Sequence, residues 1–216
     1  EALEVLRQTF GNRHPSTLTS ISNLGTLLQA KRDLAAAEPL LREALEAQRE
    51  TLGSRHPSTL KSINNLGMLL QAKGDLTAAE PLLREALEVQ RETLGNRHPD
   101  TLAFIENLGG LLLNKGDLAA AETLCREALE GRRETLGNRH PDTLHSISNL
   151  GLLLQAKGDL AAAKPLYREA LEGRGETLGK RHPDTLDSIS NLGVLLWAKG
   201  DLAAAEPLLR EAVEGL

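Results

Sequence analysis

The sequence predicts an all-α protein, an α-solenoid built from tandem helix–turn–helix repeats. Histidine-proline pairs recur every 42 residues, with the histidines at His14, His56, His98, His140 and His182. Residues 12–53 and 54–95 are identical at 35 of 42 positions. A fixed period of this length, too short for a usual independent domain, indicates units that bury their apolar faces against neighbouring units. Aromatic residues make up only 2% of the chain, so Leu and Ala, which favour helix, must build the core.

Each repeat is predicted to begin with a helix that follows the His-Pro pair. Pro15 fits the first helical turn, where its missing N–H needs no partner. Ile21, Leu24 and Leu28 are spaced by three and four residues, which predicts the core face of this helix. We expect the helix to end near Lys31.

The second helix of each repeat is predicted to start after Asp33, which can cap the free N–H groups of the first turn. Gly53 should end this helix in a left-handed conformation. Gly25 and Ala37 are small where the two helices should approach most closely. The expected buried positions of the second helix are Leu34, Ala37, Leu41, Ala44 and Leu45.

A proline inside the second helix opposes this pattern. Pro39 recurs as Pro81, Pro165 and Pro207, while Thr123 takes its place in the third repeat. Because proline removes one backbone hydrogen bond, we expect a kink wherever it occurs and a straighter helix in the third repeat.

The chain is expected to be a single array, residues 1–216. Ala2-Leu3-Glu4 aligns with Ala44-Leu45-Glu46, so residues 1–11 are interpreted as the remnant of a preceding repeat, helical from Glu1 to Phe10. The repeats are predicted at 12–53, 54–95, 96–137, 138–179 and 180–216. Because the chain begins at Glu1 rather than Met, we expect it to be a piece of a longer protein.

Composition argues against several classes of function. The net charge is −5, whereas surfaces for nucleic acids or anionic membranes normally carry a basic excess. The single cysteine, Cys125, rules out an internal disulfide framework or a cysteine-built zinc site. No apolar run approaches the ~18 residues of a membrane span. We therefore expect a cytoplasmic protein with no cofactor and with no nucleic-acid or membrane partner.

The spacing of small and large residues resembles the tetratricopeptide signature. The residues concerned are Asn23-Leu24-Gly25, Leu28, Ala37, Leu41 and Ala44. The usual unit has ~34 residues, and a 42-residue unit with His-Pro-Asp before its first helix and Ala-Glu-Pro-Leu in its second is similar to the kinesin light chain subgroup. The resemblance implies a right-handed superhelix whose first helices line a concave groove for peptides.

The repeated histidines are candidate metal ligands, but each belongs to a different repeat. Neighbouring helices stack about 8–10 Å apart, whereas zinc ligands converge to ~2 Å from one ion. We therefore predict that each histidine makes a structural hydrogen bond next to its proline, and that there is no metal site.

No catalytic constellation is apparent, and near-identical units would supply the same residues five times. We predict that the protein is not an enzyme. Cys125 takes the place of Leu41 and Tyr167 in other repeats, so we expect a buried, inert thiol. Arg42 and Glu46 lie four residues apart and indicate a solvated face.

The candidate site is the face of the first helices that points away from the core. Its positions vary between repeats, except for one asparagine that recurs in all five. The candidate peptide-groove residues are Asn23, Asn65, Asn107, Asn149 and Asn191, together with Lys61, Met68, His145, Leu152, Val194 and Trp197.

Two of these assignments have a structural alternative. An asparagine amide can bond a peptide backbone through both donor and acceptor, but it can equally bond a neighbouring helix of its own chain. Trp197 can offer an apolar contact to a ligand, or it can pack against a further helix outside this chain. Lys61 and a protonated His145 are the only candidate cations, so strong selection for acidic peptides is not expected.

The sequence leaves two functional hypotheses open. The first is a protein–protein interaction scaffold or adaptor that binds a peptide segment in the groove. The alternative is a structural spacer without a ligand, or a consensus-like engineered array, because high identity between repeats is compatible with both. An apolar face of the last repeat needs a cover, so we also expect that either the natural chain continues past Leu216 or copies associate end to end.

Overall fold

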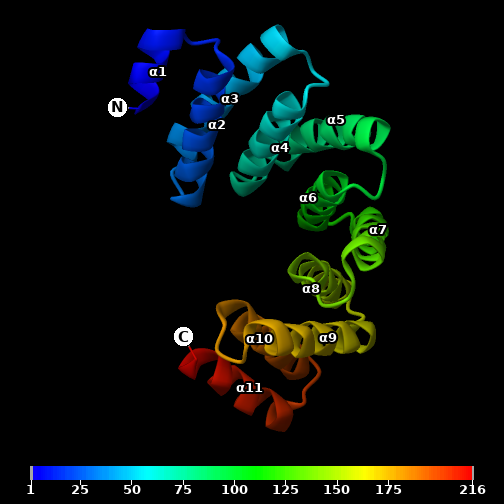
Figure 1. Ribbon diagram of the computed structural model, residues 1–216. Coiled ribbons are helices and arrows are strands. Elements are labelled where there is room, and N and C mark those ends of the chain that lie inside the picture. Colours follow the sequence, from blue (N-terminus) through cyan, green and yellow to red (C-terminus); the bar gives the residue numbers. More distant parts are fainter. Residues whose placement is uncertain (1, 216) are drawn as a thin grey trace. The chain divides into compact units, whose positions relative to one another are not determined.

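The computed structural model describes residues 2–215, with side chains from residue 4 onward, and all regular structure in this range is α-helical (Figure 1). Glu1, predicted to start the first helix, lies outside the described residues. The helices are α1 (Ala2–Phe10), α2 (Pro15–Ala30), α3 (Leu34–Leu52), α4 (Pro57–Ala72), α5 (Leu76–Leu94), α6 (Pro99–Lys115), α7 (Leu118–Leu136), α8 (Pro141–Ala156), α9 (Leu160–Leu178), α10 (Pro183–Ala198) and α11 (Leu202–Glu214).

The chain forms two compact units, residues 1–111 and residues 112–216. In the first unit α2 packs on α3, α3 on α4, and α4 on α5. In the second unit α7 packs on α8, α8 on α9, α9 on α10, and α10 on α11. This sequential pairing confirms the predicted α-solenoid of helix pairs, while the handedness of a superhelix stays a prediction. Within residues 2–215, no helix combines the length and the apolar character needed to cross a membrane.

The histidines act as caps of the first helices. His56 Nδ1 accepts a hydrogen bond from the backbone N–H of Ser58 at 3.1 Å, with Pro57 in the first helical position. The same bond, at 3.2 Å, joins His140 to Asp142. A free N–H of the first turn is thereby satisfied. This confirms the predicted structural bond, and no group of residues in 2–215 has the arrangement of a metal site.

The second helices start and end as the sequence indicates, with one difference. Asp33 accepts from the backbone N–H of Ala36 at 3.1 Å, which confirms it as the N-terminal cap. Gly53 ends α3 with φ 85° and ψ 160°, an extended rather than left-handed helical conformation. This region of backbone conformation is essentially restricted to glycine, whereas a left-handed helical conformation also admits asparagine. Position 53 therefore requires glycine more strictly than predicted.

A second set of glycines, between the two helices of a repeat, was not singled out from the sequence. Gly74 and Gly158 adopt φ values of 83° and 82°. Arg32 holds the equivalent position in the first repeat with φ 65°, where a side chain is strained. The first repeat therefore pays a conformational penalty that the later ones avoid.

Pro39 lies inside α3, and the helix continues through it from Leu34 to Leu52. The bend predicted at this proline stays a prediction. In α7 the Thr123 hydroxyl donates to the Ala119 carbonyl oxygen at 3.2 Å, so the third repeat has a different local bond at this position.

The two helices of a repeat touch at a glycine. A Cβ atom on Gly25 would lie 2.7 Å from Leu41 Cδ2, closer than side chains approach, and Ala37 is fully buried beside it. Gly151 has the same contact with the ring of Tyr167, 2.9 Å from Cε1. These contacts confirm the predicted close approach.

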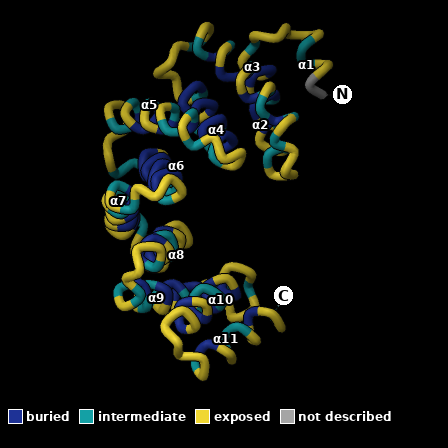
Figure 2. Tube along the Cα trace, turned by 180° about the vertical axis from the view of Figure 1, so that it is seen from behind, coloured by how far each residue is buried: buried dark blue, intermediate teal, exposed yellow. Residues whose placement is uncertain are grey.

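Burial follows the predicted core in part (Figure 2). Leu34 was predicted to be buried, but it lies in the first turn of α3 and is half-buried, as is its equivalent Leu76. Ile21, Leu41 and Ala44 are fully buried.

Leu24 and Leu28 are also only half-buried, whereas their equivalents Leu66 and Leu70 in the next repeat are buried. The nine-residue α1 gives α2 less cover than the nineteen-residue α3 gives α4.

Candidate functional site

The recurring asparagines of the first unit reach back to the preceding first helix. Asn107 Nδ2 donates to Asn64 Oδ1 at 2.9 Å, and Asn65 Nδ2 donates to Thr26 Oγ1 at 3.5 Å. Each asparagine uses one donor in this way, and the amide oxygen remains for another partner. For these two residues, the structure shows the alternative in which the asparagine bonds a neighbouring helix. Their amide oxygens can still accept a hydrogen bond from a ligand.

The remaining predicted polar residues differ in accessibility. Lys61 and His145 are exposed, and Asn23 is exposed as well. Met68, Asn149 and Asn191 are half-buried. Lys61, Met68 and Asn65 all lie on α4, so one helix offers a charged, an apolar and an amide group.

The predicted apolar residues of the second unit are unusually accessible. Leu152 on α8 is 50% exposed, and Val194 and Trp197 on α10 are 37% and 62% exposed. Trp197 is therefore not buried inside its own repeat. Side chains of this size normally leave water on folding, so their exposure marks a candidate contact surface.

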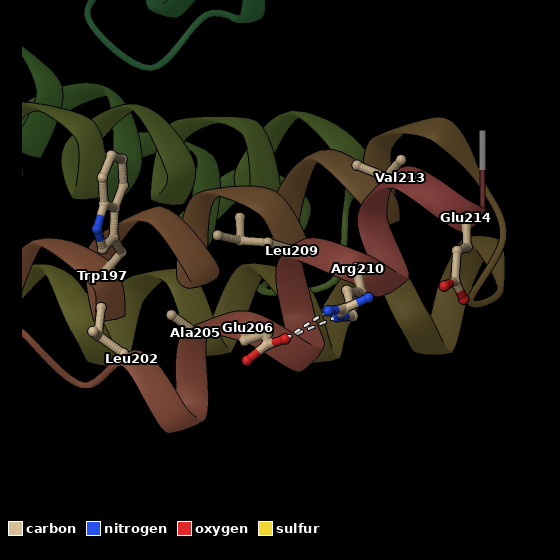
Figure 3. A pocket seen from close by; sticks show the side chains of 8 residues that line it. All are labelled: Trp197, Leu202, Ala205, Glu206, Leu209, Arg210, Val213 and Glu214. Atoms are coloured by element: carbon tan, nitrogen blue, oxygen red, sulfur yellow. Dashed lines mark hydrogen bonds and ion pairs between the residues drawn. The ribbon is translucent and has the colours of Figure 1, made fainter.

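Trp197 borders a pocket of about 620 Å³ between α10 and α11 (Figure 3). The indole stands at one end of this pocket, Leu209 lies at its centre, and Val213 lies at the far end. Leu152 and Val194 do not line it. The structure thus joins Trp197 to the surface of α11, which the sequence analysis had not connected with it. The full lining is Trp197, Leu202, Ala205, Glu206, Leu209, Arg210, Val213 and Glu214.

The surface of α11 corresponds to faces that are covered in earlier repeats. Leu41, the equivalent of Leu209, is fully buried in the first unit, where α3 packs against the following α4. Val213 is 73% exposed, whereas its equivalent Leu45 is 5% exposed. The α11 surface therefore carries the same kinds of apolar residue that are buried between neighbouring helices in earlier repeats.

The charged face of the second helices is more ordered than predicted. Arg42 pairs with Glu38 on the same helix at 2.7 Å, not with Glu46. Glu38 also pairs with Lys73, which follows α4. Hydrogen bonds from Lys73 and Arg42 hold the pKa of the Glu38 carboxyl below its ordinary value. The equivalent Glu122 has the same two kinds of partner, and its pKa is lowered in the same way.

Two buried arginines of the second unit were missed at the sequence level. Arg174 Nη1 donates to the Asp184 carbonyl oxygen at 3.2 Å and to Ser188 Oγ at 2.7 Å, which ties α9 to the start of α10. Burial lowers the pKa of its guanidinium, and the Asp184 and Asp187 carboxylates oppose that effect. Arg132 makes the equivalent bonds to Asp142 and Ser146.

A signal for these arginines was present in the sequence. Ala47-Gln48 in the first repeat becomes Gly131-Arg132 in the third and Gly173-Arg174 in the fourth, so two neighbouring positions change together. A Cβ on Gly173 would lie 2.4 Å from Leu144 Cδ2. Cys125, by contrast, is buried as predicted.

The comparison with protein families finds one family whose sequence model matches repeatedly along the chain. The tetratricopeptide repeat model matches residues 1–50, 20–92, 58–113, 100–176 and 146–216. No curated protein sequence matches the chain.

Solved structures include several with the same arrangement of helices. Kinesin light chain TPR-like repeats from Podospora anserina share 30% identity over 94% of this chain and 96% of that one, with a TM-score of 0.79. BtubC (BKLC) from P. vanneervenii shares 25% identity over 99% of this chain and 86% of that one, with a TM-score of 0.80. YrrB, described as a TPR protein with an unusual peptide-binding site, matches at 17% identity over 100% and 92% of the two chains, with a TM-score of 0.55, which speaks to the fold alone.

Proposed function

The chain belongs to the tetratricopeptide repeat family, and from that premise we propose that it is a scaffold or adaptor that binds a peptide segment along its first helices. Repeats of this family generally serve as protein–protein interaction modules, and the kinesin light chain-like fold is typically non-catalytic. The proposal adds to this a site, the expected groove on the first helices, and a ligand class, a peptide.

The exposure of Leu152, Val194 and Trp197 on first helices is the observation that carries the proposal. A ligand side chain buried against such residues gains roughly 1.5–3 kcal/mol. Tryptophan at the centre of a contact is a frequent hot spot in protein interfaces. In the first unit, Asn65 and Asn107 keep amide oxygens that can accept from a peptide backbone.

A peptide-array screen followed by calorimetry tests the proposal. Leu152→Ala and Trp197→Ala should each weaken binding of the selected peptide by ~10-fold or more, since ~1.4 kcal/mol corresponds to tenfold. Asn107→Ala should weaken binding of peptides of different sequence by a similar factor. Circular dichroism should show unchanged helix content, because these side chains are at least partly exposed.

Val213→Ala is the matched control, because Val213 is exposed and borders Trp197's pocket but lies on a second helix. If Val213→Ala and Trp197→Ala weaken binding while Leu152→Ala does not, the ligand occupies the α11 surface and the first-helix proposal is wrong. If no variant changes binding, the site lies elsewhere.

The alternative is a spacer without a ligand or a consensus-like engineered array, and one observation favours it. The first two repeats are identical at 35 of 42 positions and therefore present nearly the same surface twice. Pull-down from cell extract followed by peptide mapping separates the two functions: an array that captures no peptide at micromolar concentration supports the spacer.

The α11 surface supports a further part of the proposal, end-to-end self-association of the chain. Leu202 is 60% exposed and Val213 73% exposed on this face, and Val5 is 56% exposed on α1. The mass measured by light scattering should rise with concentration, and Val213→Glu should abolish the rise. A constant monomer mass at millimolar concentration contradicts this part.

A further inference from the structure

Neighbouring second helices are joined by one repeated ion pair. Arg49 Nη2 on α3 donates to both carboxylate oxygens of Glu85 on α5, at 2.8 and 2.7 Å. Arg133 Nη2 and the Glu169 carboxylate form the same pair in the second unit, at 2.7 and 2.8 Å. In both cases the two residues lie 36 positions apart in the sequence. The guanidinium group therefore has a fixed place between successive second helices.

The last of these pairs lacks its arginine. Gly175 on α9 occupies the arginine position, and Glu211 on α11, 36 residues later, retains the carboxylate. Within residues 4–215, no hydrogen bond or ion pair involves the Glu211 carboxylate. A Cβ on Gly175 would meet no atom within 4 Å, so close packing does not require glycine here. In a helix interior glycine costs about 1 kcal/mol relative to alanine, and it has no structural justification at this site.

A cavity of about 400 Å³ opens where the arginine would lie. Leu171, Ile189 and Leu208 border it, and all three belong to the apolar cluster at the junction of α9, α10 and α11. Glu211 supplies a carboxylate at its rim. Its size falls within the usual range of ligand pockets, about 300–1,000 Å³. The three helices, α9, α10 and α11, carry yellow, orange and red colours in Figure 1.

The other charged groups at the cavity leave Glu211 as its available anion. Glu176 pairs with Arg139 at 2.8 Å, and Glu172 pairs with the same guanidinium at 3.4 Å. Lys180 also lines the cavity and carries the only positive charge among its lining residues. The Lys180 ammonium forms no ion pair within the described residues. It therefore does not hold the Glu211 carboxylate, and a ligand cation can take that place.

We propose that this cavity binds an arginine side chain of a partner protein, whose guanidinium takes the place that Arg49 and Arg133 hold in earlier repeats. The stem of the arginine would lie over Leu171 and Leu208, and its guanidinium would donate to Glu211. The choice of a protein as the source rests on the proposed function as an interaction module. The cavity is bordered by α9, α10 and α11, but none of Leu152, Val194 and Trp197 lines it, so it is separate from the proposed peptide site.

The geometry favours arginine over lysine. The equivalent positions hold arginine, whose Nη2 atom contacts both carboxylate oxygens. A guanidinium is more weakly hydrated than an ammonium, so it loses less solvation when it enters a cavity with an apolar border. The apolar border suits the three-carbon stem that carries this group. A small inorganic cation would leave that apolar surface exposed to water.

Amide chemical shifts of Gly175, Leu208 and Glu211 provide the test, with N-acetyl-argininamide as the probe. We expect saturable shifts at millimolar probe and at least tenfold weaker binding of N-acetyl-lysinamide. N-acetyl-citrullinamide, which has the same shape without the charge, should not bind. Free arginine should bind no more tightly than the blocked form if the site recognises the side chain alone.

Three variants complete the test. Gly175→Arg should abolish probe binding and raise the melting temperature, because the chain then supplies its own guanidinium. Gly175→Ala is the matched control and should retain binding, while Glu211→Gln should weaken it at least tenfold. Binding of citrullinamide equal to argininamide, unchanged binding by Glu211→Gln, or no saturable shift at ~10 mM probe would overturn the proposal. Unchanged peptide binding by Leu152→Ala and Trp197→Ala would contradict the first-helix site but leave the result with argininamide unaffected, so the two proposals fail separately.

Discussion

Raising the pH above 10 should remove a defined part of the chain's stability through the side chain of Tyr167. Its ring is 1% exposed and packs on Gly151, and its hydroxyl donates to Gln155 Oε1 at 3.0 Å. Burial raises the pKa of Tyr167 from 10.0 to about 12. Between these values the unfolded chain loses a proton that the native chain keeps, so unfolding becomes more favourable as the pH rises.

The magnitude follows from the size of this shift. Each pKa unit corresponds to about 1.36 kcal/mol, so about 2–3 kcal/mol of stability, present in full below pH 10, should be lost as the pH rises through 12. The chain contains one tyrosine, so the ultraviolet absorbance of tyrosinate reports this residue alone. We expect the native chain to titrate near pH 12 and the urea-unfolded chain near pH 10.

Tyr167→Phe separates this effect from the titration of lysines, arginines and Cys125. The difference in urea midpoint between the parent and the variant should change with pH above 10 and be constant between pH 7 and 9. If the tyrosine of the fully helical chain ionises near pH 10, or if the difference does not depend on pH, burial does not control this group and the reasoning is refuted.

Four further predictions concern stability and are measured by thermal and urea unfolding. His56→Ala should cost about 1 kcal/mol by removing the cap of α4, while His56→Asn should cost less because its side chain can still accept from Ser58. Arg32→Gly should stabilise by up to about 1 kcal/mol, because Arg32 has a φ of 65°. Arg174→Ala should cost roughly 2–3 kcal/mol by removing two charge-assisted bonds inside the second unit, and Arg174→Lys should restore only part of this. Deletion of residues 180–216 should lower the melting temperature while the remaining repeats stay helical, because each repeat contacts mainly the neighbouring repeats.

Each of these predictions has a contradicting result. Equal stability of His56→Ala and the parent would mean that the cap is not stabilising. Gly74→Ala is the control for Arg32→Gly and should destabilise, since Gly74 has φ 83°; a loss of stability in both variants would remove strain as the explanation. If Arg174→Ala is as stable as the parent, the two hydrogen bonds of Arg174 contribute no more to stability than the hydrogen bonds to water that they replace. Loss of all helix on deletion at low temperature would contradict stacking between nearest neighbours.

Local signals in the sequence were sufficient to predict the helices. The His56 and Asp33 caps act on backbone groups two or three residues away, and the helices begin beside them as expected. Gly53 ends its helix through its own backbone freedom. Because each of these interactions spans less than one helical turn, the order of residues alone determines them. The close contact at Gly25 was also predictable, since the period brings the same small residue to every helix pair.

Interactions between repeats depended on the tertiary structure. The sequence could not decide whether Asn107 bonds Asn64, because that bond requires two first helices to lie at the right distance. It placed Trp197 with Leu152 among the groove residues, and that grouping stays a prediction, but only the structure shows that Trp197 also borders the surface of α11.

The same distinction applies to charge. Arg42 can form a pair four residues away in either direction, and Lys73 from the next repeat joins it on Glu38. The glycine at position 175 was visible in the sequence, but only the stacking of α9 and α11 on α10 shows that it opens a cavity beside Glu211. The repeat and its helices thus follow from the order of residues, because caps and periodicity act locally. Which side chains meet depends instead on the spacing of helices that are dozens of residues apart in the chain, and that spacing is a property of the folded protein.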